Sequence, residues 1–498
     1  MSVVLACDLG GTSFRAALVD ATGESVARCA RPAPELREEG GASETPAARW
    51  WDRLVEAAGE LARSAPGDFA RVVAISICGV TRTQVLLDAA GAEIRPALTW
   101  KDVRAEATAT RLKARLAGHP EAEGINAFHP LARLAWLAEA EPDAAAALAS
   151  VLDPKDYLNF RLTGRRASDA ISMARLAACA AMSGGVDPFA AAGAPRGVLP
   201  ALLAPHAPVG AVLPALPAPL DRLAGVPVMC CAADTWAAVA GLGALRPGRA
   251  YNISGTTEVF GVVSETAAQA PGLLTVDWGG LWQLGGPGQN GADTLAWLLA
   301  LLGEGAAPGS VGATMAALLA GPRDPQPLLF LPYLQGERTP YWNVALRGAF
   351  VGLNRRHGAT DLAYAVLEGV GFLNRIVLER AEAALGTRVT AIRFGGGASA
   401  NDAWSQIKAD ICGRPVLVCD AAEPGLLGAA MVGWTGLGRF PSLDAAQERL
   451  ARVARRFEPR PGRRSFYDAL FGLFRQAEAA LAPVSCDLSS LTRDGERP

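Results

Sequence analysis

The sequence predicts an α/β protein with at least two domains. The chain has 498 residues, and single hydrophobic cores rarely grow beyond about 250–300 residues. Two glycine-rich turns each interrupt a β-like run, at residues 8–14 (DLGGTSF) and 252–258 (NISGTTE). A third glycine cluster, residues 395–400 (GGGASA), lies between a strand-like run and a helix-like run. Strand–turn–strand and strand–turn–helix units in one chain are typical of sheets accompanied by helices.

The first half is expected to contain strands at residues 3–7, 16–19 and 72–77 and helices at residues 47–64, 102–116 and 131–140. The proline- and alanine-rich stretch 187–219 predicts an irregular excursion. A Pro/Gly turn at residues 246–249 marks a boundary. The second half is expected to contain strands 259–263, 389–394 and 416–419 and helices 361–385 and 401–410. We therefore predict domains at 1–245 and 246–485, with 486–498 as a disordered tail.

Composition excludes several classes of partner. The chain carries 47 basic and 49 acidic side chains, so it has no global attraction for nucleic acid or anionic membranes. Its nine cysteines lack C-x-x-C spacing and its four histidines lack metal-ligand spacing, which favours reduced, buried thiols. The first residues lack the basic start of a signal peptide, and apolar runs such as 294–302 are too short to span a bilayer. We expect a cytoplasmic protein.

One carboxylate ends an apolar run at residues 226–234 (VPVMCCAAD). Desolvating a carboxylate there costs several kcal/mol unless hydrogen-bond or ionic partners compensate for it, so its presence indicates either such partners or a function. Asp234 is therefore our leading candidate for a catalytic base.

The two glycine turns give Asp234 a context. Glycine lets backbone amides approach a phosphate closely, and Thr and Ser hydroxyls add donors. For either turn alone, an ordinary Gly-Gly hairpin is the simpler interpretation. Aligning residues 11–13 with 255–257 also places Asn252 opposite Asp8, which suggests an internal duplication.

The third glycine cluster fits the pattern G-x-G-x-x-A, and Asp420 closes the next strand. This pattern imitates a dinucleotide fingerprint, so an NAD-dependent oxidoreductase is a rival hypothesis. A complete dinucleotide fold needs further βαβ units, whereas the residues after Asp420 are mostly helix-like. We interpret the cluster as a turn that contacts a nucleotide.

The chain resembles the FGGY carbohydrate kinase family, and within it the xylulose kinases. Nine stretches occur in the family order: 8–13, 95–104, 154–164, 233–235, 254–257, 331–340, 348–353, 395–398 and 423–429. The sequence contains no Gly-Lys dipeptide, so a Walker A phosphate loop is absent.

The resemblance implies two ribonuclease-H-like domains of the actin/hexokinase type, with ATP and sugar meeting in an interdomain cleft. It implies ATP-dependent phosphorylation of a small sugar or polyol with Mg²⁺, D-xylulose being the best guess and ribulose, erythritol or glycerol the alternatives. Asp234 would take the proton from the sugar hydroxyl, and Asp8 would help to hold the magnesium. The residues that would contact ATP are Gly11, Thr12, Ser13, Arg15, Gly255, Thr256 and Thr257 at the phosphates, and Gly396, Gly397, Ala398 and Asn401 at the adenosine.

The sugar pocket departs from the xylulose kinases. Those carry Gln-Met-His-Gly where this chain has residues 79–83 (GVTRT), so substrate selection can differ, since arginine offers more donors than histidine. The candidate substrate residues are Thr81, Arg82, Trp100, Asp102, Asp234 and Thr235. A surface charge remains the alternative for Arg82, and a core position the alternative for Trp100. Arg133 replaces a lysine usual in the family, a change that we expect to affect packing rather than chemistry.

Relatives are commonly dimers, so the resemblance suggests a homodimer. A sugar sensor that has lost its chemistry is another class to consider, but the chain shows no DNA-binding extension. Because Asp8, Asp234 and both hydroxyl-rich turns occur together, we favour a catalyst.

Overall fold

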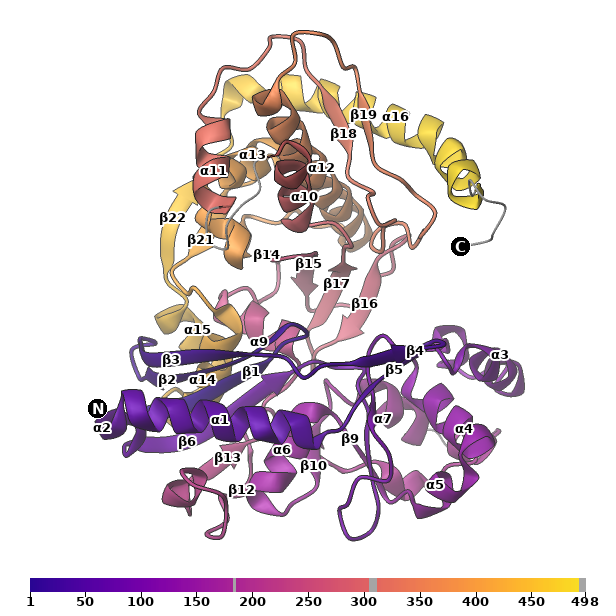
Figure 1. Ribbon diagram of the computed structural model, residues 1–498, viewed down its shortest axis with the longest axis vertical. Helices are drawn as coiled ribbons and strands as arrows, with labels where there is room; N and C mark the ends of the chain where they lie inside the picture. The colour runs from indigo at the N-terminus through magenta and orange to yellow at the C-terminus, as the bar shows by residue number, and fades with distance from the viewer. Residues whose placement is uncertain (182–184, 304–310, 492–498) are drawn as a thin grey trace. The chain divides into compact units, whose positions relative to one another are not determined.

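The computed structural model describes residues 1–181, 185–303 and 311–491, which form two compact units (Figure 1). Unit 1 comprises Met1–Gly241 and Pro424–Leu450, and unit 2 comprises Leu242–Glu423 and Ala451–Pro498. The chain thus leaves unit 1 after Gly241 and returns to it at Pro424. Residues 424–450 fall in the range expected for the second domain, yet they pack in unit 1.

Unit 1 is built on a six-stranded sheet with the order β12-β13-β6-β1-β2-β3. Its strands are β1 (Val3–Leu9), β2 (Ser13–Asp20), β3 (Ser25–Pro32), β6 (Val72–Gly79), β12 (Pro208–Ala211) and β13 (Pro227–Met229). Strands β13, β6 and β1 are parallel neighbours. Every residue of β1 is buried, as expected for a strand covered on both faces. The carboxyl ends of the three parallel strands therefore lie at one edge of the sheet.

Helices cover this sheet. Helix α1 (Ala48–Ser64) packs on β2 and β3, α6 (Pro154–Thr163) packs on β6, and α14 (Pro424–Gly436) packs on β1 and β6. Helix α14 also lies against α9 (Asp234–Gly241). A Cβ on Gly428 would come within 1.8 Å of the Ala237 carbonyl oxygen, so only glycine permits this approach.

The remainder of unit 1 consists of short elements. Small sheets are formed by β4 (Arg37–Glu39), β5 (Ala42–Thr45) and β8 (Ala97–Leu98), by β7 (Val85–Leu87) and β9 (Ser150–Leu152), and by β10 (Ala167–Asp169) and β11 (Ala201–Leu203). The other α-helices are α2 (Pro66–Phe69), α3 (Glu106–Arg115), α4 (Pro130–Ala140), α5 (Pro142–Ala147), α7 (Ala174–Ala180), α8 (Pro188–Ala191) and α15 (Leu443–Leu450). The predicted irregular stretch 187–219 contains α8, β11 and β12, so part of it is regular.

Unit 2 has a seven-stranded sheet with the order β16-β17-β15-β14-β20-β21-β22. Its strands are β14 (Arg249–Ser254), β15 (Glu258–Ser264), β16 (Leu274–Asp277), β17 (Trp282–Pro287), β20 (Ile392–Gly395), β21 (Val416–Cys419) and β22 (Val453–Phe457), with β18 (Leu329–Leu331) and β19 (Ala349–Val351) forming a separate pair. Its helices are α10 (Asp293–Leu301), α11 (Val311–Leu319), α12 (Ala359–Leu385), α13 (Asp402–Cys412) and α16 (Arg464–Ser490).

The C-terminal region differs from the predicted tail. Helix α16 continues through residues 486–490, although the sequence after Val484 shows no periodic core pattern. The helix is able to extend because its backbone hydrogen bonds do not require a buried face in the last turns. Residues 492–498 lie outside the described part of the chain.

The two large sheets share one topology. In unit 1 the hairpin β1–β2 adds the parallel strand β6 beside β1, and in unit 2 the hairpin β14–β15 adds the parallel strand β20 beside β14. Both glycine turns join the strands of these hairpins. This equivalence supports the internal duplication that the sequence suggested.

Candidate active site

The predicted catalytic residues of unit 1 gather at one edge of its sheet. Asp8 lies near the end of β1, paired in register with Cys78 of β6. Gly79, the last residue of β6, forms a parallel bridge with Ala233, the residue before Asp234. The carboxyl ends of parallel strands are the usual place for ligands in α/β sheets, so Asp8 and Asp234 occupy a position suited to chemistry.

Asp234 begins helix α9 and is half-buried. Its Oδ1 accepts hydrogen bonds from the Thr235 backbone N–H at 2.6 Å and from the Thr235 hydroxyl at 3.2 Å. Burial raises the pKa of Asp234 above its ordinary value, although the two bonds from Thr235 act in the opposite direction. A carboxylate with a raised pKa accepts a proton more readily. Asp234 therefore has the properties of a general base, and Thr235 orients it.

Asp8 has surroundings that suit one carboxylate ligand of a metal. Its Oδ2 lies 3.8 Å from Nη1 of Arg15, the residue opposite it across the hairpin. A Cβ on Gly425 would lie 2.6 Å from Asp8 Oδ2. Any larger residue at position 425 would therefore clash with the Asp8 carboxylate. Mg²⁺ is commonly held by one or two carboxylates together with substrate phosphates and water. Asp8 fits the first part of that ligand set.

The first glycine turn joins β1 to β2. The Gly10 backbone N–H donates to the Ser13 carbonyl at 2.9 Å, and Gly11 and Thr12 are exposed. Trp100 lies beside the turn, because a Cβ on Gly11 would be 3.8 Å from Trp100 Nε1. Trp100 is 38% exposed, which removes the alternative that it only fills the core. The structure thus brings Trp100 close to the turn predicted to bind phosphate.

The loop after β6 is held in an unusual conformation. Arg82 is exposed and has a φ of 57°, in the left-handed region that is uncommon for non-glycine residues. Its carbonyl oxygen accepts a hydrogen bond from Nη1 of Arg133 at 2.5 Å. Nη2 of Arg133 donates to the carbonyls of Thr99 at 2.7 Å and Asp102 at 3.1 Å. Arg133 therefore fixes both loops that carry the predicted sugar-binding residues, which is more than the packing role expected from the sequence.

Asp102 is almost fully buried, with 1% of its surface exposed. Its carboxylate accepts from the Ser43 backbone N–H at 3.0 Å and from Nη2 of Arg104 at 2.6 Å. Arg104 also donates to it from its backbone N–H at 3.1 Å and from Nε at 3.0 Å. A carboxylate offers about four acceptor sites, so a sugar hydroxyl would have to displace one of these donors.

Behind Asp234 lies a buried ionic cluster that the sequence did not reveal. Asp156, Asp169 and Cys230 have ligand atoms within 4.8 Å of one another, the separation of a metal site. However, the Lys155 ammonium lies 2.5 Å from Asp156 and 2.8 Å from Asp169. Lys155 therefore already supplies the positive charge. It also donates to the Cys230 carbonyl at 3.4 Å, which anchors the segment leading to Asp234.

Unit 2 brings its two predicted nucleotide-binding sets together. The turn Gly255–Thr257 connects β14 to β15, and Gly395 pairs with Ile253 of β14. Gly396 follows directly with a φ of 88°, and a Cβ there would lie 2.4 Å from the Ser254 carbonyl oxygen. Only glycine satisfies both conditions. Gly397 is exposed beside it, and Ala398 is buried.

Asn401 caps helix α13, because its Oδ1 accepts from the Trp404 backbone N–H at 3.0 Å. This local role explains an asparagine at that position without a ligand. Beneath the hairpin, Asn252 donates to Glu258, and Glu258 also pairs with Lys408 at 3.2 Å. This buried network supports the second turn and was not predicted.

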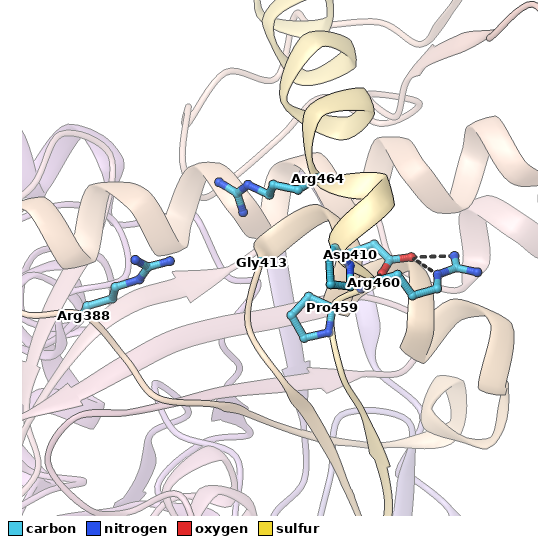
Figure 2. A pocket seen from close by; sticks show the side chains of 7 residues that line it. Arg388, Asp410, Gly413, Pro459, Arg460 and Arg464 are labelled. Atoms are coloured by element: carbon cyan, nitrogen blue, oxygen red, sulfur yellow. Dashed lines mark hydrogen bonds and ion pairs between the residues drawn. The ribbon is translucent and has the colours of Figure 1, made fainter.

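A pocket of about 320 Å³ lies elsewhere in unit 2 (Figure 2). It is lined by Arg388, Asp410, Gly413, Pro459, Arg460, Pro461 and Arg464. Arg460 donates to Asp410 at 2.5 Å, and Figure 2 shows this pair joined by dashed lines among the lining residues. The pair fastens α13 to the segment before α16, and no predicted site residue lines the pocket.

Comparison with known proteins decides the family. Residues 3–241 match the N-terminal domain of the FGGY family of carbohydrate kinases, and residues 250–437 match its C-terminal domain. The chain belongs to this family. It is therefore a carbohydrate kinase, which transfers a phosphoryl group from ATP to a sugar, and the oxidoreductase hypothesis is set aside.

Relatives of this kinase include a xylulose kinase of Escherichia coli, 31% identical over 89% of this chain and 90% of that protein. A glycerol kinase of Gloeobacter violaceus is 28% identical over 89% of this chain and 90% of its own length. A solved structure of xylulose kinase from Rhodospirillum rubrum has a TM-score of 0.83 and 29% identity, covering 97% of this chain and 99% of that one. These similarities confirm the predicted two-domain α/β fold of the actin/hexokinase type.

Among residues 1–181, 185–303 and 311–491, no helix combines the length and hydropathy that crossing a bilayer requires. The individual roles of the site residues remain predictions.

Proposed function

We propose that this kinase transfers the γ-phosphoryl group of ATP to D-xylulose and forms xylulose 5-phosphate. The observation that carries the proposal is the position of Asp234, at the start of α9 and beside the ends of parallel strands, in a chain that resembles xylulose kinases over most of its length. Kinases for ribulose, erythritol, glycerol or another sugar are the alternatives. The glycerol kinase relative and the unusual loop at Thr81 and Arg82 keep those alternatives open.

In the proposed reaction, Asp234 accepts the proton of the attacking hydroxyl as the oxygen bonds to phosphorus, and ADP leaves. Phosphoryl transfer has a loose transition state that asks mainly for alignment and charge stabilisation. Backbone amides and hydroxyls of Gly11, Thr12 and Ser13 would contribute donors toward the phosphates, and Arg15 a positive charge. Gly255, Thr256 and Thr257 would do the same from unit 2. Arg82, Trp100, Asp102, Thr81 and Thr235 would hold the sugar.

Asp8 is the proposed magnesium ligand. The ion would neutralise charge on the phosphates. Gly396, Gly397 and Ala398 would approach the adenosine, with Asn401 fixing the start of the following helix. We place the kinase in the cytoplasm, where ATP is available and free cysteines persist: eight of the nine are buried and none is paired among the described residues. A homodimer stays a prediction.

A coupled assay of ADP release tests the proposal. Full-length protein is mixed with ATP, Mg²⁺ and, in turn, D-xylulose, D-ribulose, erythritol and glycerol, with absorbance of NADH in the absence of ATP as a control for oxidoreductase activity. The proposal requires the highest kcat/KM with D-xylulose. A higher value with another substrate would assign that substrate instead, and no sugar-dependent ADP release would indicate a sensor.

A further inference from the structure

Several buried polar atoms of unit 1 have no hydrogen-bond partner among the described residues, and three of them are Gln84 Oε1, Arg133 Nε and Asp153 Oδ2. Their residues are 3%, 1% and 5% exposed. Leaving one buried polar group unsatisfied costs about 1–3 kcal/mol, so native proteins rarely tolerate several together. A partner from outside the chain would remove this cost.

The three atoms come from one corner of the unit. Strands β7 and β9 are antiparallel with Val85 opposite Leu152. Gln84 comes just before Val85 and Asp153 just after Leu152, so both lie at the same end of the pair. The Gln84 side-chain amide donates to the Pro130 carbonyl at 3.2 Å, at the start of the helix that carries Arg133. Three separate elements therefore converge on this corner.

This corner adjoins the candidate active site. Asp153 is the N-cap of α6 and makes no capping bond with its side chain. Two residues on, Lys155 Cβ lies 3.4 Å from the position of a Cβ on Gly79, and Gly79 bridges to Ala233 beside Asp234. Burial and nearby Asp156 raise the pKa of Asp153 well above its usual range, and the charge of Asp234 adds to this effect.

The Arg133 guanidinium and the Asp153 carboxyl group do not contact each other. Asp153 acts electrostatically on Arg133, yet the two form no ion pair within the parts of unit 1 that the structure describes. Arg133 is held in place by the carbonyls of Arg82, Thr99 and Asp102, so it is not free to close the gap. A hydroxyl group matches such a gap, because it accepts one hydrogen bond and donates another.

We propose that Gln84, Arg133 and Asp153 form a hydroxyl-binding subsite that receives a sugar hydroxyl other than the one phosphorylated. Arg133 Nε donates to the hydroxyl oxygen, and the hydroxyl donates to Asp153 Oδ2 or Gln84 Oε1. The inference rests on the proposed function, since it assumes a sugar bound beside Asp234. An ordered water has the same hydrogen-bonding chemistry and is the other possible occupant.

The test uses full-length Asp153→Asn and Asp153→Leu, with Asp187→Ala as a matched control. Asp187 is also an N-cap aspartate of unit 1, but its side chain is 38% exposed and pairs with Arg196. The assay measures kcat and the KM values of sugar and ATP with D-xylulose, its C3 epimer D-ribulose, and analogues that each lack one hydroxyl. Thermal unfolding of each variant is measured in parallel.

We expect Asp153→Leu to raise the KM of the sugar about 10- to 100-fold, because the variant removes a hydrogen bond and leaves a buried hydroxyl without its partner. The KM of ATP should stay within about twofold, since none of the residues proposed to contact ATP belongs to the subsite. One deoxy analogue should be used equally well by wild type and variant, which identifies the bound hydroxyl. Asp153→Asn should fall between the two because it keeps an acceptor oxygen.

Other outcomes overturn the inference. If sugar KM values are unchanged and the unfolding temperature falls, the occupant is a water with a structural role. If the activity of the variant falls equally with every sugar and every deoxy analogue, Asp153 does not bind a particular sugar hydroxyl. A wild-type protein without sugar-dependent ADP release would instead refute the proposed function, which separates that failure from failure of the subsite.

Discussion

Replacing Lys155 by methionine should destabilise unit 1 by about 3–5 kcal/mol, the range for breaking one side of a buried ion pair. The side chains of Lys155, Asp156 and Asp169 are all fully buried, and methionine has a similar length, so the loss would come from charge and not from a cavity. Two carboxylates would remain without their cation. For a domain of this size the unfolding temperature should fall by about 6–20 °C.

The effect should depend on pH in a defined direction. Burial raises the pKa of Asp156 to about 6, while Lys155 acts to lower it. Without the ammonium, the pKa of Asp156 would rise further. A carboxyl group with a raised pKa in the folded state stabilises the protein below its unfolded pKa, and this stabilisation is lost as the pH rises through the folded value. The deficit of Lys155→Met should therefore be larger at about pH 8 than at about pH 5.

Scanning calorimetry of the full chain measures this deficit. The matched control is Lys113→Met, because Lys113 pairs with Glu123 and their side chains are 41% and 89% exposed. The control should change stability by less than about 0.5 kcal/mol. A Lys155→Met deficit below about 1 kcal/mol, or one that is equal at both pH values, would refute the reasoning that Lys155 serves as the cation of this cluster.

Three further predictions concern single substitutions. Asp234→Asn should lower kcat by about 10²- to 10⁴-fold, and an unchanged kcat would exclude Asp234 as the base. The kcat/KM of the wild-type enzyme should fall as the pH drops through the raised pKa of Asp234. Gly396→Ala should raise the KM of ATP and lower stability, because the new Cβ meets Ser254 and the φ of 88° disfavours it; an ATP KM equal to wild type would contradict this. Gly428→Ala should separate α14 from α9 and lower the unfolding temperature of unit 1, since its Cβ would overlap the Ala237 carbonyl; calorimetry would show no shift if the helices can yield.

The sequence predicted the two hairpins, the strand 72–77 and the helix 361–385 because each is local. Short apolar runs separated by a glycine-rich turn indicate a hairpin, and apolar residues at helical spacing indicate a long helix. The predicted tail was wrong for residues 486–490, since a helix can continue beyond its last buried residue.

The supporting residues could not be predicted, because their partners are far apart in the sequence. Arg133 contacts the carbonyls of Arg82 and Thr99, and no local pattern links these positions. Lys155 lies in a stretch shared with the family, but its role depends on Asp169 and on the strand leading to Asp234. The packing of residues 424–450 in unit 1 could not be predicted either. Helix α14 is apolar on all sides, so its sequence is compatible with packing in either unit.

The two topologically equivalent hairpins carry different residues at one corresponding position. In unit 1 the position holds Asp8, whose carboxylate lies near Arg15 and keeps 11% of its side chain exposed. In unit 2 the equivalent Asn252 is fully buried and donates to Glu258. A carboxylate beside a polyphosphate needs a cation, because like charges repel strongly where water is scarce, whereas an amide does not. The proposed assignment of magnesium to Asp8 alone therefore agrees with the chemistry of each hairpin. In unit 1 the Asp8 carboxylate can bind a metal ion, and in unit 2 the Asn252 amide instead supports the glycine turn through its hydrogen bond to Glu258.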